Sequence, residues 1–351
     1  MIPSLPLRAK GLETPEYTVR RWTRMSIWGT SGLGVAVVVM ALLPFMVNLS
    51  VTYAMIDFFI LLLLAMTWNM LAGYGGMVSV GQQAYIGIGA YAVVVFADTF
   101  GLNIIVTILL AAIVSAILAF PISFFAFRLV GGYFAIGTWV LAEVVRLIVV
   151  QFPQIGGGSG VSLAAMSDLP KELRIAFSYW IALGAAVIVL VVCVWLVRSR
   201  IGLALTAVRD DVTAASTSGV RVQSVRRRVF IFAAAAAGVA GALVAISTLR
   251  VQPDSVFSVQ WSAFMIFIVV VGGVGTLEGP IIGAIIFWAL KQLLADYGPL
   301  YLILLGIVGI VFVLFVRGGV WGAVSRRKRL ELFPVGYRFS RSDKDGSKQA
   351  P

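Results

Sequence analysis

The stretch TYAMIDFFILLLLAMTWNMLA at residues 52–72 decides the fold class of this chain. It is 21 residues long and carries a single charged residue, Asp57. An α-helix needs about 20 mostly apolar residues to cross the hydrocarbon core of a membrane. The stretch therefore predicts a transmembrane helix.

Similar apolar runs follow one another along most of the chain. They predict an all-α, polytopic transmembrane bundle of about ten spans. The range is eight to ten, because the third, eighth and ninth runs are short or interrupted by glycine. The runs are residues 27–47, 52–72, 82–97, 103–127, 133–152, 175–197, 229–249, 259–271, 281–295 and 300–316.

The composition excludes several classes of function. Of the 351 residues, 60% are hydrophobic and 12% are charged, whereas a soluble domain carries roughly 25% charged residues. The chain has one cysteine, Cys193, and no histidine, which argues against a disulfide framework, a thiolate metal site and hydrolytic chemistry that uses histidine. The net charge of +12 lies mainly outside the apolar runs, so we expect a membrane partner and no nucleic acid.

The distribution of basic residues predicts the orientation. Cytoplasmic loops of membrane proteins are enriched in lysine and arginine. If both termini are cytoplasmic, 22 of the 27 basic residues fall on the cytoplasmic side, and only Lys171, Arg174 and Arg250 fall in outside loops. We expect a cytoplasmic arm at residues 1–26, a permease domain at 27–325 and a basic, disordered cytoplasmic tail at 326–351, in the inner membrane of a bacterium.

The loop at residues 198–228, RSRIGLALTAVRDDVTAASTSGVRVQSVRRR, has its own pattern. Leu205, Val208, Val212 and Ala215 recur every three or four residues, which predicts one face of a short helix at 201–219. Gly219 is a suitable stop for that helix. The apolar residues are small and aliphatic, whereas helices that lie on lipid usually carry bulky aromatics. This favours burial of the stripe in a groove of another protein. The alternative is a surface loop whose arginines only reflect the cytoplasmic bias of basic residues.

Several motifs in order resemble one family. The chain is similar to the LivM-like permeases, one of the two membrane subunits of branched-chain amino acid ABC transporters, over most of residues 60–325. The motifs that carry the resemblance are AGYGGMVSVGQ at 72–82, GGYFAI at 131–136, GLALTAVRDD at 202–211 and GGVGTLEGP at 272–280. The resemblance implies that residues 201–219 dock on a cytoplasmic ATPase through Gly202, Leu205, Ala207, Val208, Arg209, Asp210, Asp211, Ala215 and Gly219.

The resemblance also implies a set of partners. They are a second, homologous permease, two ABC ATPases that hold ATP and magnesium, and a periplasmic solute-binding protein. In this chain no lysine follows a glycine, so it lacks the Gly-Lys-Ser/Thr end that a P-loop needs. We expect no cofactor in the chain itself. Branched-chain amino acids are the first choice of cargo, and urea, short amides or aromatic acids are the alternatives.

Two glycine-rich segments, residues 73–89 and 272–283, predict the translocation path. Backbone without regular secondary structure is tolerated at membrane depth only where it is buried in protein or lines a water-filled cavity. Pairs of segments interrupted by glycine are typical of substrate pathways in transporters. The alternative is close helix packing through small residues. The candidate path residues here are Gly75, Gly76, Gln82, Gln83, Tyr85, Gly272 and Gly273.

Charged residues inside the spans are the remaining candidates. Glu143 and Arg146 lie three residues apart and can pair on one helix face. They either assist a zwitterionic substrate or form a structural ion pair. An ion-coupled transporter would use Glu143 or Asp57 to carry the proton or sodium ion. That interpretation gives the 201–219 helix no function. An intramembrane enzyme is disfavoured, because no nucleophile and base converge around Cys193.

Overall fold

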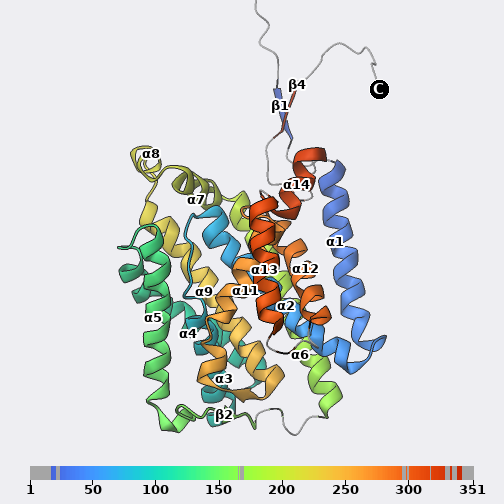
Figure 1. Cartoon of the computed structure of the whole chain (residues 1–351), viewed down its shortest axis with the longest axis vertical. Coiled ribbons are helices and arrows are strands. Elements are labelled where there is room, and N and C mark those ends of the chain that lie inside the picture. Colours follow the sequence, from blue (N-terminus) through green and yellow to red (C-terminus); the bar gives the residue numbers. More distant parts are fainter. Residues whose placement is uncertain are drawn as a thin grey trace, which may run out of the picture.

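The structure, a computed structural model, describes residues 17–20, 24–164, 166, 170–294, 298, 300–316, 318–328, 333 and 338–341. The described part is an all-α bundle with two short β-ribbons at its ends (Figure 1). Every predicted apolar run falls on a helix. These helices are α1 (Arg24–Leu42), α2 (Leu49–Asn69), α3 (Gln83–Val93), α4 (Ile104–Ala126), α5 (Gly132–Val150), α6 (Lys171–Arg198), α9 (Val222–Thr248), α11 (Gln260–Gly272), α12 (Gly279–Leu293) and α13 (Leu300–Phe315).

Within the described residues, six stretches are long and apolar enough to cross a membrane. They are Leu49–Tyr74, Ile104–Ala126, Gly132–Val150, Lys171–Arg198, Val222–Thr248 and Pro253–Gly272. Four further apolar helices are shorter: Gly29–Phe45, Gln83–Thr99, Gly279–Leu293 and Leu302–Phe312. The apolar character of a multi-pass membrane bundle is thus confirmed, and the count of ten spans stays a prediction.

Short irregular helices extend or join the main ones. The π-helical turns η2 (Met70–Tyr74) and η3 (Val94–Thr99) continue α2 and α3. The 3₁₀ turns η1 (Leu43–Phe45) and η4 (Pro153–Ile155) follow α1 and α5, and the one-turn helix α10 (Pro253–Val256) precedes α11. Turns of this kind absorb changes of direction at the ends of helices.

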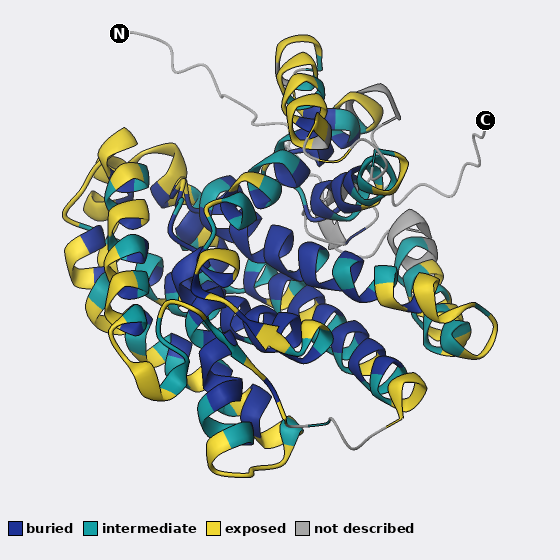
Figure 2. Ribbon diagram, turned by 60° about the horizontal axis from the view of Figure 1, so that its bottom comes forward, coloured by how far each residue is buried: buried dark blue, intermediate teal, exposed yellow. Residues whose placement is uncertain are grey.

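Helix α9 forms the centre of the bundle. It packs against α2, α3 and α4, and most of its residues are buried. Figure 2 shows the buried residues gathered in the middle of the bundle. Its small residues explain the close approach: a Cβ at Gly238 would overlap the backbone of Ala111, and one at Gly241 would overlap the carbonyl of Ile86. Membrane helices without bulky side chains at the interface bring their backbones together in this way.

The two ends of the bundle differ. At one end lie α7 (Arg200–Asp210), α8 (Val212–Thr217), α14 (Gly319–Lys328) and the ribbon of β1 (Tyr17–Arg20) with β4 (Arg338–Arg341) (Figure 1). At the far end, β2 (Val161–Ser162) pairs with β3 (Arg250–Val251). We call these the α7–α8 end and the far end.

The C-terminal tail departs from expectation. Phe333 is buried, and its backbone N–H donates a 3.1 Å hydrogen bond to Glu278 Oε1. Arg338–Arg341 pairs with Tyr17–Arg20. These contacts differ from the disorder expected of the tail, which stays a prediction for residues 326–351 as a whole. Residues 329–332, 334–337 and 342–351 lie outside the described part.

Candidate functional site

The segment predicted as one helix at 201–219 is two helices. Asp211 leaves the helical conformation, with φ −154° and ψ 113°, and separates α7 from α8. Its carboxylate accepts hydrogen bonds from the N–H groups of Thr213 (2.7 Å) and Ala214 (2.9 Å). Aspartate is a preferred N-cap because it satisfies the free N–H groups at a helix start. The single-helix prediction is wrong for this local reason.

Both ends of the segment depend on glycine. Gly219 adopts φ +85° directly after α8, and Val220 N–H closes the turn on the Ala215 carbonyl at 3.1 Å. The predicted stop at Gly219 is confirmed. A Cβ at Gly202 would overlap the carbonyl oxygens at the end of α6. Glycine at this position thus lets α7 fold back closely on α6.

The apolar stripe of the segment lies inside the chain itself. Leu205 and Val208 have no exposed surface, and Ala215 is buried, because α7 packs on α6, α9 and η2. The expectation that a partner's groove buries these residues is wrong. Val212 was placed on the same stripe, but the break at Asp211 turns it outward and leaves it 43% exposed.

A different face of the segment is open. Leu203 is 73% exposed, and Ala207, Asp210 and Val212 are exposed with it. We call these four residues the outer face of α7–α8. The segment that carries this face lies at the α7–α8 end of the bundle (Figure 1).

Arg209 ties α7 to the first glycine segment. Its Nη1 donates a 2.8 Å hydrogen bond to the carbonyl oxygen of Gly73, and its Nη2 lies 2.9 Å from Asp210 Oδ1. Gly76 adopts φ +65°, and a Cβ there would lie 3.3 Å from Arg209 Cγ. At Gly75, a Cβ would lie 3.1 Å from a methyl of Leu205. Predicted path residues and predicted coupling residues are therefore neighbours.

Asn69 joins the two glycine segments to each other. Its Oδ1 accepts a 2.8 Å hydrogen bond from Gly275 N–H, and its Nδ2 donates a 2.8 Å bond to the Thr276 carbonyl. Gly275 takes φ +76° beside Gly73. We call Asn69, Gly73, Gly75, Gly76, Gly275 and Thr276 the glycine junction. Asn69 was missed at the sequence level, where its only signal was an amide inside an apolar run.

The other glycines of the second segment pack tightly. A Cβ at Gly272 would overlap the carbonyl of Gly279, and Gly273 holds φ +134°. This geometry favours the close-packing alternative for these two positions. Their role in a path stays a prediction.

The polar residues predicted for the path are buried. Gln83 Oε1 accepts a 2.6 Å hydrogen bond from Ser262 Oγ, which joins α3 to α11. Tyr85 packs edge-on against Phe230, with ring centroids 5.9 Å apart. It lines a cavity of about 10 Å³, which has room for one water at most. Gln82 Oε1 is buried without a partner among the described residues.

Glu143 and Arg146 pair as predicted, and a third residue joins them. Arg146 Nη2 lies 2.6 Å from Glu143 Oε1, and Arg146 Nη1 lies 3.0 Å from Asp254 Oδ1. Asp254 belongs to α10, so the cluster fastens α5 to α10. The Glu143 side chain is 45% exposed. This arrangement fits the structural ion pair better than a free carrier.

Asp57 also has a partner that the sequence did not reveal. Lys291 Nζ lies 2.6 Å from Asp57 Oδ2 and links α12 to α2. On the preceding turn of α12, Trp288 Nε1 donates a 3.0 Å bond to the Ala54 carbonyl. Each charge offsets part of the cost of placing the other at membrane depth.

The described residues show no metal-type cluster. Within the ranges described, no three His, Cys, Asp or Glu side chains gather as metal ligands would. Cys193 is buried in α6. Hydrogen bonds of Arg209 and Asn69 connect α7 to the glycine segments that follow α2 and α11.

Comparison with known proteins gives one consistent result. Residues 50–316 match the family described as the permease component of the branched-chain amino acid transport system. The high-affinity branched-chain amino acid transport system permease protein LivM of Salmonella typhimurium is 29% identical over 293 residues, covering 75% of this chain and 68% of that protein.

Two further relatives carry similar descriptions. LivM of Escherichia coli is 28% identical over 303 residues, covering 78% of this chain and 70% of that protein. A probable LivM of Methanocaldococcus jannaschii is 26% identical over 198 residues, covering 56% of each. No solved structure matches the chain at a significant level.

Proposed function

The chain belongs to the branched-chain amino acid transport system permease family, and from that premise we propose that it is the membrane-spanning subunit of an ATP-driven ABC importer. The observation that carries the proposal is the family match over residues 50–316. The importer would lie in the inner membrane of a bacterium, with a second permease, two ATPases and a periplasmic binding protein as partners.

The orientation of the proposal follows from charge. The arm, the 198–228 loop and the tail hold most of the basic residues, and their described parts gather at the α7–α8 end (Figure 1). The positive-inside rule assigns such an end to the cytoplasm. ATPases act in the cytoplasm, so the outer face of α7–α8 is placed where an ATPase can reach it.

The proposed coupling uses the contacts of α7. An ATPase docks on the outer face of α7–α8, and α7 carries its movement inward. Leu205 is packed inside the bundle, and Arg209 is bonded to Gly73, so α7 and the glycine junction shift as one body. The different contacts of the ATPase in its open and closed states supply the free energy for the switch.

The cargo in this proposal is a branched-chain amino acid, as the names of the relatives state for those proteins. Related importers for urea, short amides or aromatic acids remain the alternative, because the binding protein supplies most of the selection in such a system.

The contacts of the ion pairs bear on the alternative of an ion-coupled transporter. Glu143 and Asp57 each form an ion pair with a basic side chain, so neither is the unpaired carboxylate that an ion carrier would offer.

The test is reconstitution. The tagged chain is purified from native membranes with the proteins that accompany it, and the assembly is placed in liposomes with the binding protein. We expect a second permease and two ATPases, and leucine uptake that stops without ATP. A chain that purifies alone and moves leucine down an ion gradient would refute the proposal.

A further inference from the structure

A polar pocket opens at the far end of the bundle, away from α7–α8. Its volume is about 380 Å³, and it lies between the ends of α2, α6 and α9. Two cations, Lys171 and Arg174, line it from α6. Ser50, Tyr53 and Ser247 add three hydroxyl groups, and Leu49 and Ile175 add apolar walls.

The placement of the two cations is unusual for this chain. The sequence places only three of the 27 basic residues in outside loops, and Lys171 and Arg174 are two of those three. In the structure both lie in the first turn of α6. Neither side chain forms an ion pair with another described residue. Within the described part of the chain, these two cations line one hollow without an ion-pair partner, on the side where the chain carries few basic residues.

The chemistry of the lining fits an aliphatic amino acid. A carboxylate accepts charge-assisted hydrogen bonds from an ammonium and a guanidinium. Hydroxyl oxygens accept hydrogen bonds from an ammonium group, and Leu49 and Ile175 offer contact to a branched side chain. Ligand pockets of about 300–1,000 Å³ are typical for small molecules, so the volume is sufficient.

We propose that this pocket binds the carboxylate of the amino acid as it leaves the binding protein and before it crosses the membrane. The proposal rests on the proposed function and adds the contact residues to it. Tyr53 and Asp57 are four residues apart on α2 and share a face. Asp57, paired with Lys291, therefore follows one turn deeper as the next polar contact.

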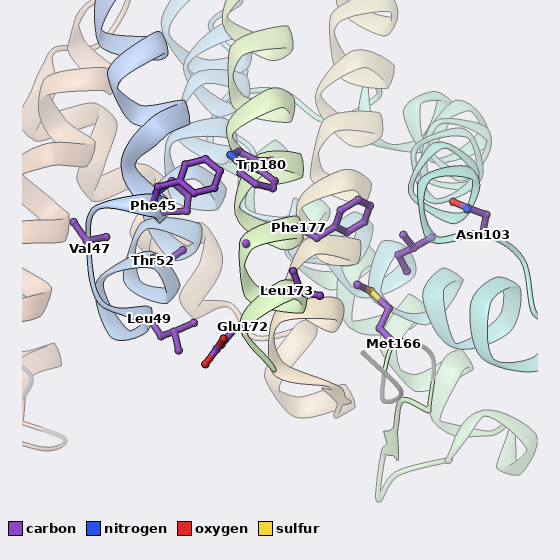
Figure 3. A pocket seen from close by; sticks show the side chains of 13 residues that line it. Phe45, Val47, Leu49, Thr52, Asn103, Met166, Glu172, Leu173, Phe177 and Trp180 are labelled. Carbon is purple, nitrogen blue, oxygen red and sulfur yellow. The ribbon is translucent and has the colours of Figure 1, made fainter. Parts of the chain in front are cut away.

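A larger pocket on the other side of the α2–α6 contact differs in chemistry. It has a volume of about 820 Å³, and Phe45, Phe177 and Trp180 are among its mostly apolar lining residues (Figure 3). Among the described residues that line it, Glu172 is the only charged one, and its carboxylate would repel that of an amino acid. We therefore assign the amino acid to the smaller, cationic pocket.

The test uses the single native cysteine, Cys193, which is buried. In the full co-purified assembly, Ser247→Cys places one reactive thiol in the pocket. Labelling by a membrane-impermeant thiol reagent is timed with and without millimolar leucine. We expect leucine to slow labelling about fivefold or more, the protection expected at several times the dissociation constant. Ser159→Cys, in an exposed turn of the far end, should show no protection.

A second arm removes the charges. Lys171→Gln with Arg174→Gln should abolish protection by leucine and raise the leucine concentration for half-maximal uptake about tenfold. Arg250→Gln removes the third cation of the far end, outside the pocket, and should change neither value. Unchanged protection and uptake in the double variant would overturn the site and leave the proposed function standing.

The remaining outcomes separate the two claims. If wild-type assemblies show protection but no ATP-driven uptake, the site stands and the proposed function fails. If leucine gives no protection at Ser247→Cys in the wild-type background, the site is refuted. Loss of bound phospholipid in the double variant, with leucine protection intact, would refute it as well and assign the cations to a lipid phosphate.

Discussion

Arg209 Nη1 donates a 2.8 Å hydrogen bond to the carbonyl oxygen of Gly73, 136 residues earlier in the chain. This bond connects the exposed α7–α8 segment to the point where the two glycine segments meet. An arginine can make it because its planar fork leaves a second nitrogen free for Asp210. The bond joins an exposed helix to a buried glycine segment.

The first prediction concerns this bond. Arg209→Ala should lower ATP-driven uptake about tenfold, the equivalent of ~1.5 kcal/mol for one hydrogen bond to a charged group. ATP hydrolysis should continue, since the ATPases themselves are unchanged. Arg200→Ala, which removes an exposed arginine at the start of the same helix, is the matched control. Equal uptake by both variants would show that the Gly73 bond carries no coupling.

A second prediction concerns the cap of α8. Asp211→Ala should cost α8 about 1 kcal/mol, because the N–H groups of Thr213 and Ala214 lose their acceptor. Hydrogen exchange at Thr213–Ala215 should accelerate about fivefold. Asp211→Asn keeps an acceptor at the same position and should retain most of the protection. If both variants exchange alike, charge rather than capping holds the segment.

The third prediction concerns glycine packing. Gly272→Ala should lower the free energy of unfolding by about 1–3 kcal/mol, because the new methyl has no room against Gly279. Gly184→Ala is the control, since a Cβ at Gly184 meets nothing within 4 Å. Thermal unfolding can be followed with a dye that reacts with Cys193 once it is uncovered. Equal melting temperatures would contradict the packing account.

A fourth prediction concerns Asp57 and Lys291. The single changes Asp57→Asn and Lys291→Met should each destabilise the chain, because each leaves one charge unpaired at membrane depth. The double variant should regain about 1 kcal/mol, a modest value because both side chains are partly exposed. Thermal unfolding of the wild type, the two single variants and the double variant is followed with the dye that reacts with Cys193. Strict additivity of the two losses would show that the pair does not interact.

The fifth prediction separates a structural cluster from an ion carrier. Glu143→Gln should leave uptake within about threefold of wild type, because Arg146 keeps Asp254 as a partner. Arg146→Ala should be more damaging, since it leaves two neighbouring carboxylates without a cation. Complete loss of uptake in Glu143→Gln, with normal expression, would instead support a carrier role.

Much of the fold follows from the sequence. Long apolar runs such as residues 52–72 have one physical solution in a membrane, because a helix satisfies all of its own backbone hydrogen bonds. The stop at Gly219 follows from local chemistry as well, since glycine reaches positive φ at little cost. The N-cap at Asp211 also depends on local chemistry, but the apolar periodicity continues across Asp211 and predicts one unbroken helix.

Only the tertiary structure decided which residues meet. The stripe of Leu205 and Val208 is visible in the sequence. Its periodicity predicts that one helix face is buried, but it does not predict which helix or protein covers that face. Asn69 with Gly275, and Asp57 with Lys291, come from distant segments whose pairing depends on how the helices pack. The sequence by itself determined the apolar helices, the stop at Gly219 and the family. Packing decided the contacts, because each contact depends on the relative position of helices that share no local signal.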